Sequence, residues 1–171
     1  MSLDFERTCS DPSHGNEKVP LVGIKAEGDG IRYVFACGHG QIIQVVGDPN
    51  IVQIANRLRE NTDKSLDELY EELSEFELVH SQVKIAKKHD KKRGESIFKG
   101  TMPYLREIIC DKFKLCEKIE YFQVGLPPTT ALLIAEGLVS ANPNWNYGAI
   151  ILIASILMHI PLIKLKKLCS C

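Results

Sequence analysis

The sequence lacks the features that mark several large classes of protein. Its N-terminus carries no basic stretch followed by an apolar one, which is the pattern of a secretory signal. It contains no internal repeat, no low-complexity tract and no nucleophile-elbow or protease signature. The formal net charge of the 171 residues is −1, so the protein as a whole is not a polycation. These absences favour a cytoplasmic, globular protein without catalytic activity.

Six cysteines are present, and the compartment decides how they are interpreted. A cytoplasmic compartment keeps thiols reduced, so we expect metal ligation or simple packing rather than disulfides. The six positions are Cys9, Cys37, Cys110, Cys116, Cys169 and Cys171. Cys110 and Cys116 are expected to point to different faces of one helix. For Cys169 and Cys171 the alternatives are lipidation, a second metal pair, or no role.

Residues 1–48 are predicted to form a small β domain. A Gly-Asp-Gly turn at 28–30 and a second tight turn at 37–40 separate three β-rich runs. The predicted strands are 19–26, 31–36 and 41–46. This pattern predicts a three-stranded antiparallel β meander, similar in its general geometry to small zinc-ribbon and zinc-knuckle modules. A meander of this size needs a staple or a partner surface to be stable.

Two Cys/His pairs in this region predict a metal site. Cys9 and His14 lie in the polar N-terminal loop, while Cys37 and His39 lie in the second tight turn. Four such donors complete a tetrahedral Cys2His2 site, for which zinc is the expected occupant. Zinc binding would also supply the energy that a short meander lacks. The alternatives are a buried Cys37 with an incidental exposed His39, or Cys–His nucleophilic catalysis, for which the sequence offers no evident orienting group.

Residues 49–171 are predicted to form a helical domain of about five helices. Ser65 and Glu68 form a capping box at the start of the longest helix, predicted over 65–93 with Gly94 as its end. Apolar residues at spacings of three and four give this helix a seam suited to a protein partner or to self-association. The other predicted helices cover 51–59, 101–119, 129–140 and the segment from 146 onward.

A basic block ends the long predicted helix. Its members are Lys87, Lys88, Lys91, Lys92 and Arg93. Lysine and arginine clusters neutralise phosphates, so the block supports a nucleic-acid-binding regulator that uses residues 84–93. The simpler interpretation is a solvated helix end, where the helix dipole favours cations.

The C-terminal region has aromatic, apolar and basic segments in the order found at membrane spans. Trp145 and Tyr147 precede sixteen uncharged residues, 148–163, and a lysine cluster follows. With the apolar segment before it, this run predicts a hydrophobic helical hairpin over 128–168. A membrane-associated or pore-type effector would insert residues 131–163, but the run is shorter than the ~20 apolar residues that span a bilayer. A core helix surrounded by other helices is the favoured interpretation.

The sequence therefore predicts an α+β protein in two parts, a zinc-binding β meander and a helical bundle. We expect a non-enzymatic interaction or regulatory role in which the zinc ion is structural. A membrane-associated effector and a nucleic-acid-binding regulator are the two alternatives.

Overall fold

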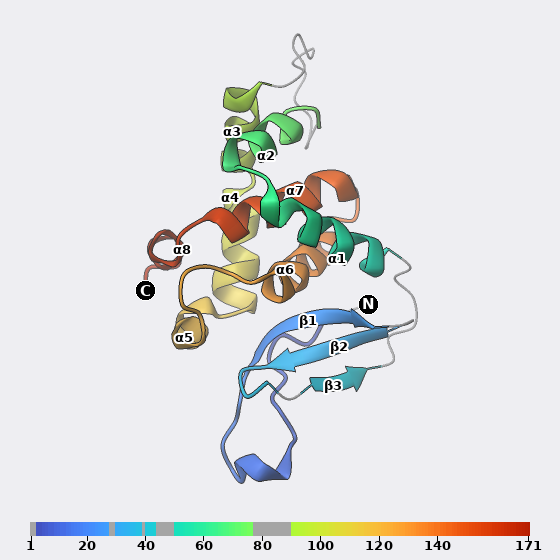
Figure 1. The fold of residues 1–171 in the computed structure, drawn as a ribbon. Coiled ribbons are helices and arrows are strands. Elements are labelled where there is room, and N and C mark those ends of the chain that lie inside the picture. Colours follow the sequence, from blue (N-terminus) through green and yellow to red (C-terminus); the bar gives the residue numbers. More distant parts are fainter. Residues whose placement is uncertain (1–2, 28–29, 39, 44–49, 77–89) are drawn as a thin grey trace.

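A helical body covers one face of a small antiparallel β-sheet (Figure 1). The computed structural model describes residues 3–27, 30–38, 40–43, 50–76 and 90–171. The strands are β1 (Leu21–Glu27), β2 (Gly30–Phe35) and β3 (Gly40–Ile43), in the order β1-β2-β3. The helices are α1 (Ile51–Glu60), α2 (Leu66–Leu73), α3 (Lys91–Gly100), α4 (Met102–Arg106), α5 (Leu115–Lys118), α6 (Pro128–Ala141), α7 (Tyr147–His159) and α8 (Leu162–Leu168). Shorter 3-10 and π-helical segments are η1 (Pro12–His14), η2 (Asn61–Asp63), η3 (Glu107–Lys112) and η4 (Ile119–Tyr121).

The sheet is fixed to the helical body where β1 meets the start of α6. A Cβ atom at Gly23 would lie 2.7 Å from the backbone of Thr129, so only glycine permits this approach. Beside it, the hydroxyl of Thr130 donates a hydrogen bond of 2.6 Å to the carbonyl of Val22. Ile24 and Tyr33 are partners across β1 and β2 and are both buried, so one face of the sheet belongs to the core.

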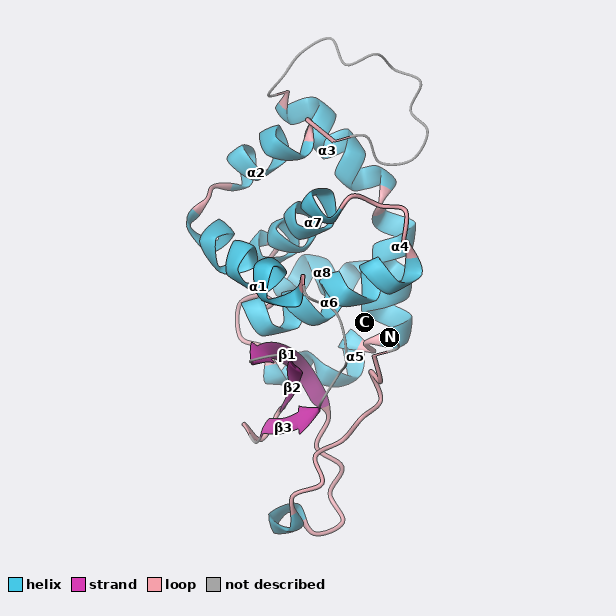
Figure 2. Cartoon of the chain, turned by 90° about the vertical axis from the view of Figure 1, so that its right-hand side faces the viewer, coloured by secondary structure: helices cyan, strands magenta, loops and turns pink. Residues whose placement is uncertain are grey.

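α6 and α7 form the centre of the core. Residues 130–138 of α6 and 149–157 of α7 are all buried. Figure 2 shows α7 between α1 on one side and α4 on the other. A helix that is apolar on every side is stable in water only when other elements surround it, as they do here. The apolar residues 149–157 are therefore interior in this structure.

α2 and α3 pack against each other as separate helices, which corrects the single helix predicted over 65–93. α2 ends at Leu73, and α3 begins at Lys91 with Asp90 as its cap. The backbone N–H of Asp90 donates to the Ser74 hydroxyl at 3.0 Å, and Arg93 Nε donates to the Ser74 carbonyl at 2.9 Å. The Ser74 carbonyl, at the end of α2, thus accepts a hydrogen bond from a side chain of α3. Residues 77–89, which include part of the predicted seam, lie outside the described residues.

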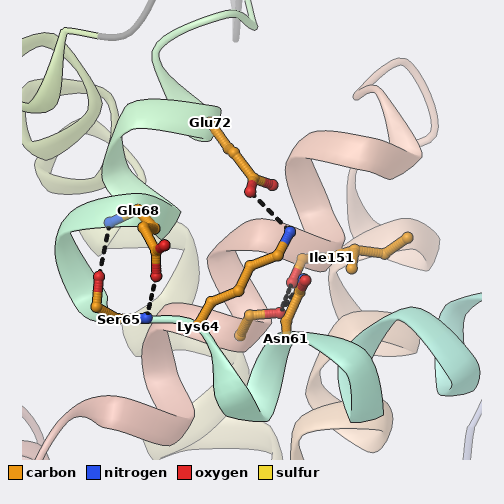
Figure 3. A network of polar contacts seen from close by, with 7 residues as sticks. Asn61, Lys64, Ser65, Glu68, Glu72 and Ile151 are labelled. Carbon is orange, nitrogen blue, oxygen red and sulfur yellow. Dashed lines mark hydrogen bonds and ion pairs between the residues drawn. The ribbon is translucent and has the colours of Figure 1, made fainter.

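The start of α2 and its link to α7 depend on a small polar network (Figure 3). The predicted capping box is present: Ser65 and Glu68 each accept the other's backbone N–H, at 3.2 and 2.7 Å. One turn earlier, the buried Asn61 donates from its side-chain amide to the hydroxyl of Ser155 at 2.9 Å. Ser155 donates in turn to the Ile151 carbonyl at 2.7 Å. These two hydrogen bonds join the connection between α1 and α2 to the middle of α7.

The segment predicted as one helix over 101–119 is broken into three parts. α4 continues into the π-helical η3, and the chain then turns at Lys114, which has a left-handed conformation with φ of 56°. α5 begins immediately after this turn. Cys110 lies in η3 and Cys116 in α5, so the expectation that both sit on one continuous helix is wrong.

The mixed α+β class and the antiparallel pairing of β1 with β2 are confirmed. The prediction of about five helices is too low, because the described residues contain eight α-helices. The additional helices arise at breaks that hydrophobic periodicity does not reveal, such as Lys114 and the bend at Pro161. No feature of the described residues identifies the sheet as a zinc ribbon.

Candidate metal centre

Cys9 and Cys37 are brought together because their neighbours pair with the same short segment, 19–21. The backbone N–H of Cys9 donates to the carbonyl of Val19 at 2.9 Å, and Thr8 forms an isolated bridge with Pro20. On the other side, the N–H of Ala36 donates to the Pro20 carbonyl at 3.0 Å. The N-terminal segment and the end of β2 therefore flank residues 19–21 on opposite sides, and both cysteines lie near this segment.

A short helical turn in the loop between Cys9 and Val19 brings His14 close to the two cysteines. Asp11 caps η1 by accepting from the Ser13 N–H at 2.8 Å, and a proline occupies the first turn. Gly15 ends the turn with φ of 58°, a conformation that glycine adopts without strain. The local sequence thus folds the loop so that the His14 ring faces the cysteines.

One donor atom each from Cys9, His14 and Cys37 lies within 4.8 Å of the other two. Around a tetrahedral zinc ion with Zn–S and Zn–N bonds of about 2.3 and 2.0 Å, donor atoms are about 3.5 Å apart. The three donors therefore need to approach by little more than about 1 Å to hold one ion. All three residues are half-buried, which allows an ion to enter from solvent.

The pKa of the Cys9 thiol reflects groups on both sides of the site. The largest influence is the backbone N–H of Asp11, which donates toward the sulfur and lowers the pKa. Desolvation and the adjacent Cys37 thiol act in the opposite direction, and the pKa of Cys9 is raised overall. Two thiolates this close would repel each other. A bound cation removes that repulsion, so metal binding and loss of the thiol protons are coupled.

The structure thus places three of the four predicted metal ligands together. His39, the fourth, lies outside the described residues, as do Lys87 and Lys88 of the basic block. Gly38, immediately before His39, has φ of 80° and donates its N–H to the Phe35 carbonyl at 2.9 Å. A tight turn therefore follows β2, but it covers residues 35–38, with Cys37 as its third residue rather than its first.

The remaining four cysteines form two disulfides, which corrects the prediction that all six are reduced. Cys110 pairs with Cys169 at a Cα–Cα distance of 5.2 Å, and Cys116 pairs with Cys171 at 5.6 Å. These pairs were not predicted, because the absence of a secretory signal was taken to indicate a compartment that keeps thiols reduced. Two features of the sequence could have indicated disulfides: the even number of cysteines, and the two cysteines that follow α8. Disulfide pairing removes this set from consideration as a second metal pair in the oxidised protein.

The described part of the basic block contributes to packing between α2 and α3. Lys91 Nζ lies 2.8 Å from a carboxylate oxygen of Asp67 and 3.9 Å from one of Glu95. The hydrogen bond that Lys91 donates to the Asp67 carboxylate is the main reason that the pKa of Lys91 is raised. Arg93 is bonded to the end of α2, whereas Lys92 is exposed. Lys91 and Arg93, two of the three described residues of the basic block, therefore form contacts within the fold.

The length and composition of the apolar C-terminal helices bear on the predicted membrane alternative. Within the described ranges, no single helix has the length and apolar character needed to cross a bilayer. α7 and α8 meet the length and composition requirement only when taken together, and they are bent by 112° at their junction.

The three cysteine and histidine donors are the feature of this molecule with the most defined chemistry. They come from the N-terminal loop and the end of β2, outside the helical body. Comparisons with protein families, with curated proteins and with solved structures found no match to this chain.

Proposed function

We propose that this protein binds one structural zinc ion through Cys9, His14 and Cys37 and acts as a non-enzymatic interaction or regulatory protein. The observation that carries the proposal is the convergence of two thiols and one imidazole from distant positions of the chain. His39 is the expected fourth ligand, because it follows Cys37 by two residues in the turn predicted over 37–40.

The donor set favours zinc over other common cations. Thiolate ligands bind soft and borderline metals, whereas magnesium and calcium require oxygen donors. Two thiolates and one or two imidazoles form a closed tetrahedral set of the kind found in structural zinc sites. A cavity of about 530 Å³ is lined by residues 121–127 and 158–161 and does not include these ligands. A structural role is therefore favoured over a catalytic one.

The proposed ion would hold the loop between Cys9 and Val19 against the end of β2. The loop residues 15–18 are exposed and give this segment little apolar surface to bury. A metal bond replaces the missing hydrophobic contacts, because binding energy at such a site is folding energy. The sheet and its loop would then form a rigid surface that a protein partner can recognise.

Two other functions stay predictions. A membrane-associated effector would have to expose residues of α6 and α7 that are buried in this structure. Liposome flotation of the intact chain tests it, and a protein that stays wholly in the unbound fraction would count against it. A nucleic-acid-binding regulator would rely mainly on Lys92 and on residues outside the described ranges. Salt-dependent retention on heparin tests it.

Metal analysis and cobalt substitution test the zinc proposal. We expect about one zinc ion per chain, and tetrahedral d–d bands with thiolate charge-transfer bands when cobalt replaces zinc. Cys9→Ser, His14→Asn and Cys37→Ser should each weaken binding by at least about 100-fold. His39→Asn decides whether His39 or a water completes the site.

Cys116→Ser is the matched control, because it removes a thiol that the structure places in a disulfide. This variant should retain zinc at the parental stoichiometry. A parent chain that stays metal-free after titration with zinc, or equal zinc loss in Cys116→Ser and Cys9→Ser, would overturn the proposal.

A further inference from the structure

Four cysteines gather where the C-terminal segment meets the region around α5. The disulfides Cys110–Cys169 and Cys116–Cys171 are named here the cysteine clasp. The two bridges are adjacent, since Cys116 Sγ lies 3.7 Å from the backbone oxygen of Cys169. The clasp closes two overlapping loops, with sequence separations of 59 and 55 residues.

α8 depends on the clasp for its attachment to the body. Of the seven residues of α8, only Leu165 is fully buried, at 1 % exposure. Its first residue, Leu162, donates a backbone hydrogen bond of 3.0 Å to the Val124 carbonyl. Figure 1 shows α8 at the edge of the molecule, ending beside the C-terminus. A seven-residue helix with one buried side chain is not stable by itself.

The two disulfides differ in their access to solvent. Cys116 and Cys171 are exposed, whereas Cys110 and Cys169 are half-buried. Thiol–disulfide exchange requires a thiolate to reach one sulfur along the bond axis, so exposure controls its rate. The outer bridge, Cys116–Cys171, is therefore accessible before the inner one.

The two cysteines of the outer bridge differ in their charged sequence neighbours, because Glu117 follows Cys116 and lysines precede Cys171. The chain contains no Asp or Glu after Glu136, while Lys164, Lys166 and Lys167 precede Cys171. The backbone N–H of Cys171 donates to the Lys166 carbonyl at 3.0 Å, which keeps the cysteine beside this lysine-rich helix. Nearby cations stabilise a thiolate, and a more stable thiolate leaves faster.

We propose that the cysteine clasp is a thiol–disulfide exchange site, which a dithiol reductant opens at Cys116–Cys171 first, and that its full reduction releases α8. The reductant's thiolate attacks Cys116 Sγ, and the electron pair of the broken S–S bond leaves on Cys171 as a thiolate. The second thiol of the reductant then attacks its own mixed disulfide, which frees the Cys116 thiolate. Each bridge thus takes two electrons, and the dithiol becomes a cyclic disulfide.

Release of α8 changes the surface of the helical body. A cavity of about 370 Å³ lies between α2, α3 and α8, with Tyr70, Phe98 and Met102 on the body side. Leu165 and Leu168 of α8 form part of its opposite wall. Opening the clasp removes that wall, so a larger part of this apolar surface becomes accessible in the reduced protein.

Differential alkylation of the full-length, zinc-loaded protein during a dithiothreitol titration tests the order of reduction. Free thiols are blocked at each concentration, and the four cysteines are quantified by peptide mass spectrometry. We expect Cys116 and Cys171 to become reactive at dithiothreitol concentrations at least about tenfold lower than Cys110 and Cys169. Simultaneous reduction, or reduction of the inner bridge first, would overturn the proposed order.

Hydrogen exchange of residues 162–171 tests the release. We expect exchange to increase at least about tenfold only after both bridges are reduced. The double variant Cys116→Ser/Cys171→Ser, which retains the inner bridge, should keep α8 protected until dithiothreitol is added. Unchanged protection after complete reduction, or four reactive thiols in the untreated protein, would overturn the proposal.

The same measurements in a Cys9→Ser/Cys37→Ser background separate this site from the proposed zinc centre. That background contains only the clasp cysteines, so its exchange does not depend on bound metal. We expect the same order of reduction and the same release of α8. An order that appears only in the zinc-binding parent would assign the behaviour to the metal centre and overturn the clasp as an independent site.

Discussion

Gly94 shows how one small residue can decide the packing of two helices. A Cβ atom at this position would lie 1.8 Å from the carbonyl oxygen of Tyr70, so α3 crosses α2 where no side chain fits. The sequence pattern had suggested that Gly94 ends a helix, yet it lies inside α3 and is buried. The glycine lowers helix propensity but permits a contact that no other residue allows.

Gly94→Ala should therefore destabilise the protein by about 3 kcal/mol, since overpacking against a backbone atom forces the helices apart. Gly100→Ala is the matched control, because it lies in the same helix and its Cβ atom would meet nothing within 4 Å. Urea denaturation should show a lower free energy of unfolding for Gly94→Ala. For Gly100→Ala the free energy of unfolding should be unchanged or slightly higher. Equal effects of the two variants would contradict the close contact.

Lys118 is a buried cation whose environment disfavours its charge. It is 5 % exposed, its Nζ lies 4.3 Å from the centre of the Phe113 ring, and it donates to the Phe5 carbonyl at 3.3 Å. Desolvation is the main cause that lowers the pKa of Lys118 from 10.5 to about 8. Between these two pH values the unfolded chain holds a proton that the folded chain has released, so this group makes stability rise with pH.

Lys118→Met removes this dependence. The stability of the variant relative to the parent should be greatest near pH 7 and should decline as the pH rises from about 8 to 10.5. Urea midpoints measured at pH 7, 8, 9 and 10 check the trend, with the exposed Lys92→Met as a control for general effects of charge. A difference that stays constant or grows over this range would show that Lys118 is not desolvated in solution.

The connection between α1, η2 and α7 shows that a polar contact can fix the position of core elements. Asn61 and Ser155 are buried, at 6 % and 0 % exposure. Their hydrogen bond joins residues that lie 94 positions apart in the sequence. Each satisfies the other inside an apolar environment, where an unpaired amide or hydroxyl would be costly. Figure 3 shows this contact beside the capping box of α2.

Ser155→Ala should destabilise the protein by about 2 kcal/mol, because the buried amide of Asn61 loses its acceptor. Ser96→Ala, on the exposed surface of α3, should have an effect below about 0.5 kcal/mol. Chemical denaturation measures both. The double variant Asn61→Leu/Ser155→Ala should regain part of the stability that Ser155→Ala loses. Purely additive effects of the two substitutions on stability would contradict the proposed pairing.

The whole molecule is held together by three different means. The helical body has a core of apolar side chains around α6 and α7. Under the proposed function a metal ion would hold the N-terminal loop, and two disulfides tie the C-terminal segment to the body. The N-terminal loop would then be sensitive to chelators, and the C-terminal segment to reductants.

Removal of zinc should loosen the N-terminal loop without unfolding the helical body. We expect hydrogen exchange in residues 8–20 and 35–38 to increase at least about tenfold after chelation, while α6 and α7 stay protected. Chelation followed by exchange mass spectrometry checks this, and restored protection after addition of zinc is the control. Loss of protection in α7 would show that the metal supports the whole fold.

Local sequence patterns were sufficient for features that depend on neighbouring residues. The capping box at Ser65 and Glu68, the tight turn after β2 and the antiparallel pairing of β1 with β2 follow from residue types at short spacings. The convergence of Cys9, His14 and Cys37 was also predictable, because turn residues and β pairing bring these positions together. The helix breaks at Ser74 and Lys114 were not, since their partners are distant in sequence or their backbone conformation is unusual.

By itself the sequence determined the α+β class and named Cys9, His14 and Cys37 as donors that could share a metal ion, and it favoured without deciding an interior position for the apolar C-terminal helix. These depend on local turns, on the alternation of apolar residues and on donor chemistry, all of which act over a few residues. Tertiary structure alone decided that Gly94 lies in a helix contact and that Cys169 and Cys171 pair with Cys110 and Cys116. Such contacts join residues tens of positions apart, and a single sequence does not specify their geometry until the core has brought them together.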